Sequence, residues 1–162
     1  MARVSKRHII IDHALALFLE QGYKGTSIDV VVTRSQVSKP TVYNHFPDKG
    51  QLIAAVIEHW LAEHIVPELI PFTDKTSVLS YLDRNWWNAA NIAMYRLIIG
   101  EGWRFAESAA LFWERFDQAW RAAVTNSCQR LDPPLDSVEV ANLNLRISHE
   151  LWSRLTQPVK KR

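Results

Sequence analysis

A two-helix pattern between Thr26 and Phe46 constrains the fold of this chain more than any other stretch. Thr26 is a good helix N-cap, and the apolar residues Ile28, Val31 and Val32 then recur on one helical face. These features predict a short amphipathic helix that rests on a core through its apolar side.

A second short helix is predicted over residues 39–45. Ser38 is a cap residue, and Pro40 falls in the first turn, where a proline loses no hydrogen bond. The segment is too short and too polar to exist for packing. Its polar side chains suit phosphates and base edges: Lys39, Thr41, Asn44 and His45. The two helices therefore predict a helix-turn-helix with a recognition helix.

Amphipathic segments flank this pair. Residues 5–22 place apolar side chains on one face and end at Gly22, a typical C-cap; the face consists of Ile10, Ala14, Leu17 and Phe18. Further helices are predicted over residues 48–65, 76–90, 106–131 and 137–155, with an apolar stretch over residues 91–105.

The first third of the chain, about residues 5–55, resembles the DNA-binding domain of the TetR family of bacterial regulators. The resemblance rests on Arg7, Ile10, Ile11, Ala14, Leu17, Phe18, Gly22, Tyr23, Thr26, Ser27, Val37, Ser38, Lys39, Thr41, Val42, Tyr43, His45, Phe46, Lys49 and Leu52. It implies an all-α fold: a three-helix helix-turn-helix DNA-binding head, joined by a long helix to a helical regulatory and dimerisation body. We assign residues 1–47 to the head and residues 48–162 to the body.

The chain departs from the family pattern at several positions, and Val32 and Ser35 stand where the family has its usual small residues. Gln36 stands where the family usually has a glycine in the turn; if the backbone there needs a positive φ, glutamine costs on the order of 1 kcal/mol. Pro40 replaces the usual glycine before Thr41, and Gly50 replaces a common acidic residue. These departures bear on operator preference and leave the predicted fold unchanged.

The body resembles the AefR-like C-terminal domain of the same family through residues 95–101, 104–105 and 111–113, and it is short for the family. Its many tryptophans either line a pocket for an apolar or aromatic effector or fill a helical core or dimer seam. The candidate pocket residues are Trp60, Trp86, Tyr95, Trp103, Phe112 and Trp113. Because Trp86 and Trp87 are adjacent, we expect them to point to different places.

Charge is placed unevenly along the chain. Residues 1–50 carry seven Lys and Arg against four Asp and Glu, a surplus of +3, and the chain as a whole carries +2, so the remainder sums to −1. This basic first part of the chain contains the helix-turn-helix, as phosphate binding requires. No apolar run approaches a membrane span and no signal peptide opens the chain, so we expect a cytoplasmic protein without a membrane partner.

No motif indicates catalysis or a cofactor, because the sequence shows no Gly-rich phosphate loop, nucleophile elbow or paired carboxylates. His59 and His64 are five residues apart, which is poor spacing for two metal ligands on one helical face. We expect neither an enzyme nor a metal site.

The sequence therefore predicts a transcriptional regulator, in first place a repressor released from a palindromic DNA operator by a small hydrophobic or aromatic effector. The alternative is a constitutive DNA-binding regulator without a ligand. The expected partners are operator DNA and a second copy of the chain, and the protein would be associated with the bacterial nucleoid when bound. Phosphate contacts are expected from Thr26, Tyr43, His45 and Lys49, and base contacts from Ser38, Lys39, Thr41 and Asn44.

Overall fold

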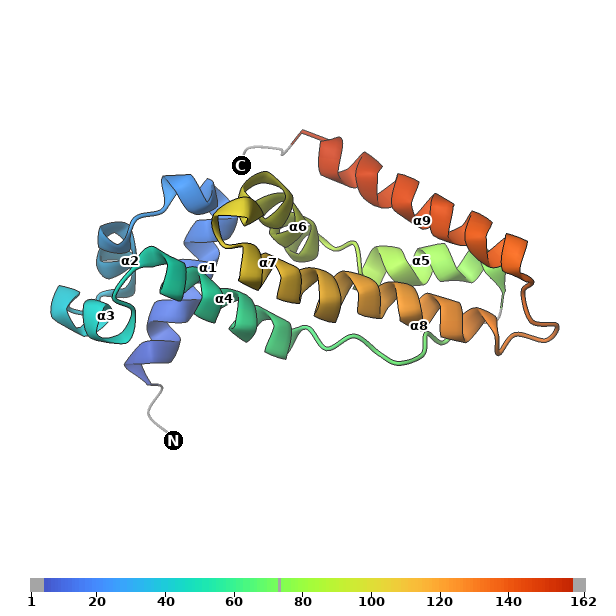
Figure 1. The fold of residues 1–162 in the computed structure, drawn as a ribbon, viewed down its shortest axis with the longest axis horizontal. Helices are drawn as coiled ribbons and strands as arrows, with labels where there is room; N and C mark the ends of the chain where they lie inside the picture. Colours follow the sequence, from blue (N-terminus) through green and yellow to red (C-terminus); the bar gives the residue numbers. More distant parts are fainter. Residues whose placement is uncertain (1–4, 73, 159–162) are drawn as a thin grey trace. The chain divides into compact units, whose positions relative to one another are not determined.

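The computed structural model describes residues 5–72 and 74–158, and the regular elements in these ranges are all helical (Figure 1). This confirms the predicted all-α fold class. The chain divides into two compact units: one comprises Met1–Ile65 and Leu97–Trp113, the other Val66–Arg96 and Glu114–Arg162. The proposed domain boundary after residue 47 stays a prediction. Within the described ranges, no helix has both the length and the apolar character that a membrane span needs.

The first unit contains the helix-turn-helix. Its elements are α1 (Lys6–Gly25), α2 (Ile28–Ser35), α3 (Lys39–His45), α4 (Lys49–Glu63), the end of α6 (Ala89–Glu101), the short 3₁₀ helix η1 (Gly102–Arg104) and α7 (Ala106–Phe112). Helix α1 packs against α2, α3 and α4, and α4 also packs against α7. The predicted apolar face of α1 is buried in this core, as are Leu52 and Val56 of α4. The first helix thus supplies the base on which the two short helices rest.

The second unit consists of helices α5 (Lys75–Asn85), α8 (Gln118–Cys128) and α9 (Ser137–Thr156), with the first part of α6 and most of a π-helical segment, η2 (Trp113–Asp117). Helix α8 packs against α9. An ion pair of 2.6 Å joins Arg154 on α9 to Asp83 on α5. Arg96 on α6 donates hydrogen bonds to three carbonyl oxygens at the end of α9, those of Arg154, Leu155 and Gln157. A basic side chain at a helix C-terminus satisfies carbonyl groups that lack partners within the helix.

Several helix ends differ from the predictions. The N-cap of α2 is Ser27, whose hydroxyl accepts from the Val30 N–H at 3.2 Å, and not Thr26, whose hydroxyl donates to the Gly22 carbonyl at 2.9 Å. The prediction of Thr26 as N-cap is wrong: both residues are of types that cap well, but the Thr26 hydroxyl bonds to the Gly22 carbonyl and does not cap α2.

The predicted helix over residues 76–90 ends at Asn85. Trp86 and Trp87 follow it in a turn, where both are buried and their rings stack with centroids 5.9 Å apart. The expectation that they point to different places assumed a continuing helix and is wrong.

Candidate nucleic-acid interface

Helix α3 presents most of its side chains to solvent. Its one buried residue is Val42; Thr41 is half-buried, and the exposed residues on the helix and its cap include Ser38, Lys39, Tyr43, Asn44 and His45. Six of the eight predicted DNA-contact residues therefore lie together on one short helix and its N-cap. The exposed side chains offer hydroxyl, amide, imidazole and ammonium groups, which are the groups that contact phosphates and base edges.

Three apolar residues hold this helix against the rest of the first unit. Val37, Val42 and Phe46 are buried, and the Arg7 guanidinium lies 5.4 Å from the centre of the Phe46 ring. Between α2 and α3, Gln36 adopts φ 57° and ψ 21°, the left-handed conformation that glycine reaches without strain. The turn therefore has the geometry for which the family uses glycine, and this chain builds it with a glutamine.

Lys39 is paired within the protein. Its ammonium lies 2.8 Å from an Asp29 carboxylate oxygen and 5.7 Å from the centre of the Tyr43 ring. The hydrogen bond and the charge of Asp29 raise the pKa of Lys39 above its usual value, so this side chain stays protonated. Residue spacing does not indicate this pair, because the two residues belong to different helices. A phosphate that binds Lys39 would compete with Asp29.

Ser38 caps α3 without a side-chain hydrogen bond to the helix backbone. Its hydroxyl instead pairs with the Thr41 hydroxyl, with the two oxygens 2.7 Å apart. Each hydroxyl keeps further hydrogen-bonding capacity, since a hydroxyl combines one donor with two acceptor sites.

Two predicted phosphate contacts, Thr26 and Lys49, lie further inside the unit. Thr26 is buried, and Lys49 is half-buried and donates from its ammonium to the carbonyl oxygens of Tyr23 at 2.9 Å and of Thr26 at 3.0 Å. Burial is the main cause that lowers the pKa of Lys49 below its usual value. The structure thus uses Lys49 to tie the start of α4 to the end of α1, and DNA contacts by these two residues stay predictions.

The six candidate pocket residues divide between the two units. In the first unit, the buried rings of Trp60 and Phe112 lie 5.6 Å apart, Trp113 packs edge-on to Phe112, and Trp103 is 70% exposed. In the second unit, Trp86 and Tyr95 are fully buried. A ligand role for these six residues stays a prediction.

A polar network crosses the aromatic core of the second unit. The Tyr95 hydroxyl accepts from the Trp86 indole N–H at 2.9 Å and donates to Asp117 at 2.7 Å. Arg121 donates to the other Asp117 oxygen at 2.8 Å. Burial, together with the Asp117 carboxylate, raises the pKa of Tyr95 far above its usual value, so this hydroxyl remains a donor. Asp117 lies in the π-helical segment η2, a kind of segment that is frequent at functional sites.

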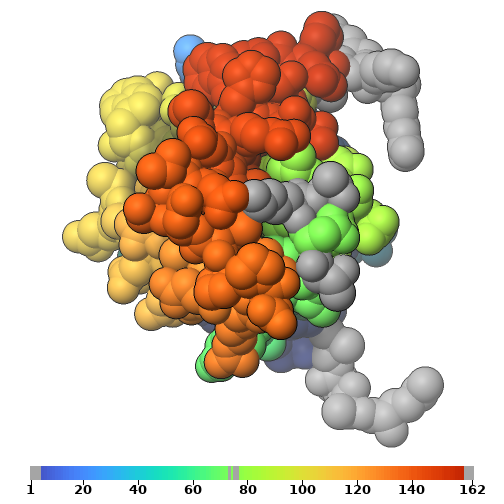
Figure 2. Space-filling model, turned by 90° about the vertical axis from the view of Figure 1, so that its right-hand side faces the viewer, coloured from blue at the N-terminus to red at the C-terminus, as the bar shows by residue number. Residues whose placement is uncertain are grey.

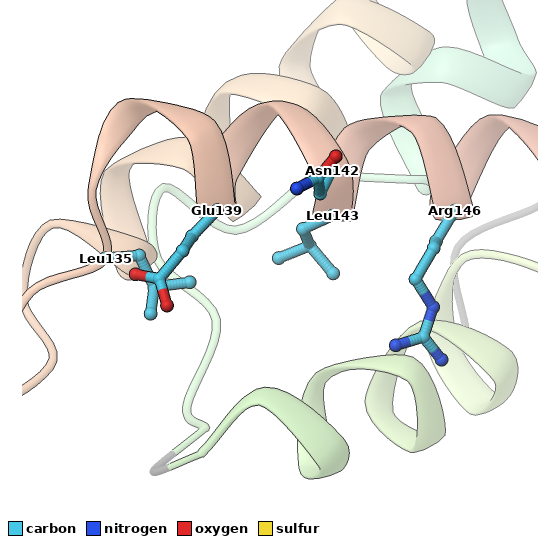
Figure 3. Close-up of a pocket in the computed structure, with 5 residues that line it drawn as sticks. All are labelled: Leu135, Glu139, Asn142, Leu143 and Arg146. Carbon is cyan, nitrogen blue, oxygen red and sulfur yellow. The ribbon is translucent and has the colours of Figure 1, made fainter.

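The second unit also has a cavity of about 200 Å³ beside α9 (Figure 3). Its lining residues are Leu135, Glu139, Asn142, Leu143 and Arg146. Figure 3 shows Leu143 and Arg146 projecting from α9 toward the helix drawn in light green, whereas Glu139 projects in the direction of Leu135. The lining combines apolar side chains with one acidic and one basic group.

Comparisons with known proteins place this geometry among bacterial regulators. Residues 10–56 match the family described as bacterial regulatory proteins, tetR family. Over 159 residues the chain is 29% identical to the transcriptional repressor ComR of Escherichia coli, covering 96% of this chain and 63% of ComR. It is 27% identical over 97 residues to the transcriptional repressor SCO4008 of Streptomyces coelicolor, covering 59% and 49% of the two chains.

A solved structure shares the whole fold. A TetR family transcriptional regulator from Pseudomonas syringae superimposes with a TM-score of 0.61 at 26% identity, covering 96% of this chain and 84% of that one. The chain spans 32%, 19% and 49% of the lengths of three curated regulators that it matches: DhaR of a Mycobacterium species, YuxN of Bacillus subtilis and SCO4008. These matched proteins are named as transcriptional regulators or repressors, in agreement with the predicted regulator.

Proposed function

This chain belongs to the TetR family of bacterial regulatory proteins, and from that premise we propose that it binds an operator in double-stranded DNA and represses transcription there. The observation that carries the proposal is the solvent-exposed polar surface of α3, which is anchored by the single buried residue Val42. A helix that buries so little of itself contributes little to the core. Its exposed side chains can instead enter a major groove.

Within this proposal, the residues of α3 and its N-cap make two kinds of DNA contact. Ser38, Lys39, Thr41 and Asn44 read base edges, and Tyr43 and His45 hold phosphates. Thr26 and Lys49 support this surface from inside the unit, where Lys49 donates to the Thr26 carbonyl, and we propose that they reach a phosphate when DNA is bound. Such a protein acts on the nucleoid in the bacterial cytoplasm.

We propose that the protein binds DNA as a homodimer through α9. Val138, Leu145 and Trp152 follow one another at intervals of seven residues on this helix, so they share a face, and they are 65%, 70% and 64% exposed. The surface of this C-terminal region, coloured orange to red, covers much of the face shown in Figure 2. A second copy of the chain, presenting the same stripe, would cover these apolar side chains and give a two-fold arrangement that matches a palindromic operator.

We further propose that a small hydrophobic or aromatic effector releases the DNA. The cavity beside α9 supports this proposal, because Leu135 and Leu143 give part of its lining an apolar surface. At about 200 Å³, the cavity is smaller than the roughly 300–1,000 Å³ of typical ligand pockets, so an effector must be small or must enlarge it. The alternative, a constitutive regulator without a ligand, is favoured by the dense packing around Trp86 and Tyr95.

Selection of bound duplexes from a random pool tests DNA binding and dimer symmetry together. We expect a palindrome whose half-sites are separated by about one helical turn. If circular dichroism shows that the protein is folded and no sequence is enriched, operator binding is contradicted. Recovery of a single half-site would contradict the dimer.

A thermal-shift screen of small hydrophobic compounds, with and without the selected operator, tests the effector. A true effector raises the melting temperature of the free protein by mass action and lowers its operator affinity. If the protein binds its operator, and no compound both raises the melting temperature and lowers the operator affinity, the constitutive alternative holds.

A further inference from the structure

A cluster of histidine and carboxylate side chains bridges α1 and α4 within the first unit. His8 and Asp12 lie four residues apart on α1, and His59 and Glu63 lie four residues apart on α4. The potential ligand atoms of His8, Asp12 and His59 all lie within 4.8 Å of one another. The two helices pack together, and they bring His8 and Asp12 of α1 next to His59 of α4.

The side chains of this cluster form ion pairs when the histidines are protonated, and their separations also match those between the ligands of a metal ion. His59 Nε2 lies 3.4 Å from Asp12 Oδ1 and 3.4 Å from Glu63 Oε1, and His8 Nε2 lies 3.7 Å from Asp12 Oδ2. Nitrogen–oxygen hydrogen bonds are shorter, about 2.7–3.2 Å. Ligand atoms about 2.1 Å from a tetrahedral ion are about 3.4 Å apart, which is close to the observed separations.

From this geometry we propose a binding site for a divalent transition-metal ion, with His8, Asp12 and His59 as ligands. Two imidazole nitrogens and carboxylate oxygens are ligands of Zn²⁺, and such sets also suit other first-row ions.

The site is open on one side, because the side chains of His8 and Asp12 are 47% and 49% exposed, whereas that of His59 is 15% exposed. An ion can therefore enter from solvent. Once bound, it would join α1, on which α2 and α3 rest, to α4. Residue spacing along one helix does not indicate this site, because the nearest histidine to His59 along α4 is His64, which stacks instead on Trp60.

Zinc titration of untagged, metal-free protein against a chromophoric chelator tests the proposal. We expect one Zn²⁺ per chain, and at least tenfold weaker binding in His8→Ala and in Asp12→Asn. His149→Ala, which removes an exposed histidine of the second unit, is the matched control and should bind like the unsubstituted protein. Zinc should raise the melting temperature of the unsubstituted protein and of the control, but not that of the two ligand variants.

Absence of stoichiometric binding would overturn the proposal, and so would equal binding by His8→Ala, Asp12→Asn and the control. Because His8 and Asp12 are half exposed, these variants should keep the fold, which circular dichroism of the metal-free proteins checks. Co²⁺ gives a second readout on the unsubstituted protein. An intense visible absorption indicates a tetrahedral site, whereas the weak spectrum of the hydrated ion would count against the proposed ligand set.

Discussion

The carboxylate of Glu101 accepts a hydrogen bond from the backbone N–H of Tyr23 at 2.8 Å, although 78 residues separate them in the sequence. Its second oxygen accepts from the Lys24 N–H at 2.9 Å. These hydrogen bonds lie just after Gly22, where φ is 74° and a Cβ atom would stand 2.7 Å from the Glu101 carboxylate. The backbone therefore favours glycine at position 22, and a side chain there would displace the Glu101 carboxylate. The end of α6 thus fixes the chain that leads into the helix-turn-helix.

Replacing Glu101 by alanine should lower the free energy of unfolding by about 1–2 kcal/mol, because two backbone N–H groups lose a charged acceptor at a partly exposed position. Urea unfolding followed by circular dichroism measures the change. Glu58→Ala, at an exposed position inside α4, is the control and should stay within about 0.5 kcal/mol of the unsubstituted protein. Equal effects of the two substitutions would show that Glu101 has no special structural role.

The helix-turn-helix could be predicted from the sequence because its signals are local. Cap residues, a proline in a first turn and an apolar face define α2 and α3 within about twenty residues, and α3 has the predicted bounds Lys39–His45. Glu101 could not be found in this way. Its partners are backbone groups, which leave no residue pattern, and they lie far away in the sequence.

In the body, too, some features could not be predicted from the sequence. The periodic segment over residues 106–131 is helical up to Cys128, but the π-helical turn within it has no periodic signal. The predicted pocket relied on residue type alone, and residue type does not distinguish an aromatic side chain that lines a cavity from one that fills a core. Trp103 and Trp86 illustrate this, since the first is largely exposed and the second is fully buried.

Gln36→Gly should stabilise the protein by about 1 kcal/mol, because glycine removes the strain of a left-handed backbone conformation at φ 57°. Part of the gain is offset by the larger conformational freedom of glycine in the unfolded chain. Gln36→Ala is the matched control, because alanine keeps the strain and should give no gain. The midpoints of urea unfolding compare the three proteins; an equal midpoint for both variants would contradict strain at this turn.

Tyr95→Phe should destabilise the protein by about 1–3 kcal/mol. The substitution leaves the buried Trp86 N–H without its acceptor and one Asp117 oxygen without its donor. Urea unfolding again measures the effect. Tyr81→Phe on α5 removes a hydroxyl outside this network and should change the unfolding free energy little. If the two variants behave alike, the network contributes nothing measurable to stability.

Tyr43→Ala should weaken binding to the selected operator and to an unrelated duplex by a similar factor, about three- to tenfold, because a phosphate contact carries no sequence information. Fluorescence anisotropy at fixed salt measures both affinities. Asn44→Ala provides the contrast, because removing a side chain that reads a base should weaken operator binding more than nonspecific binding. A sequence-dependent decrease for Tyr43→Ala would assign this residue to base recognition instead.

Asp29→Asn should strengthen DNA binding, because it releases the Lys39 ammonium from an ion pair of 2.8 Å on the recognition surface. Exposed pairs of this kind are weak because water and salt screen them, so the affinity should rise by at most about fivefold. The gain should shrink as salt is added, since salt screens exposed charges. Asp83→Asn breaks the comparable pair with Arg154 in the second unit and should leave DNA affinity unchanged. An unchanged affinity for Asp29→Asn would mean that Lys39 keeps its partner, or an equivalent one, when DNA is bound.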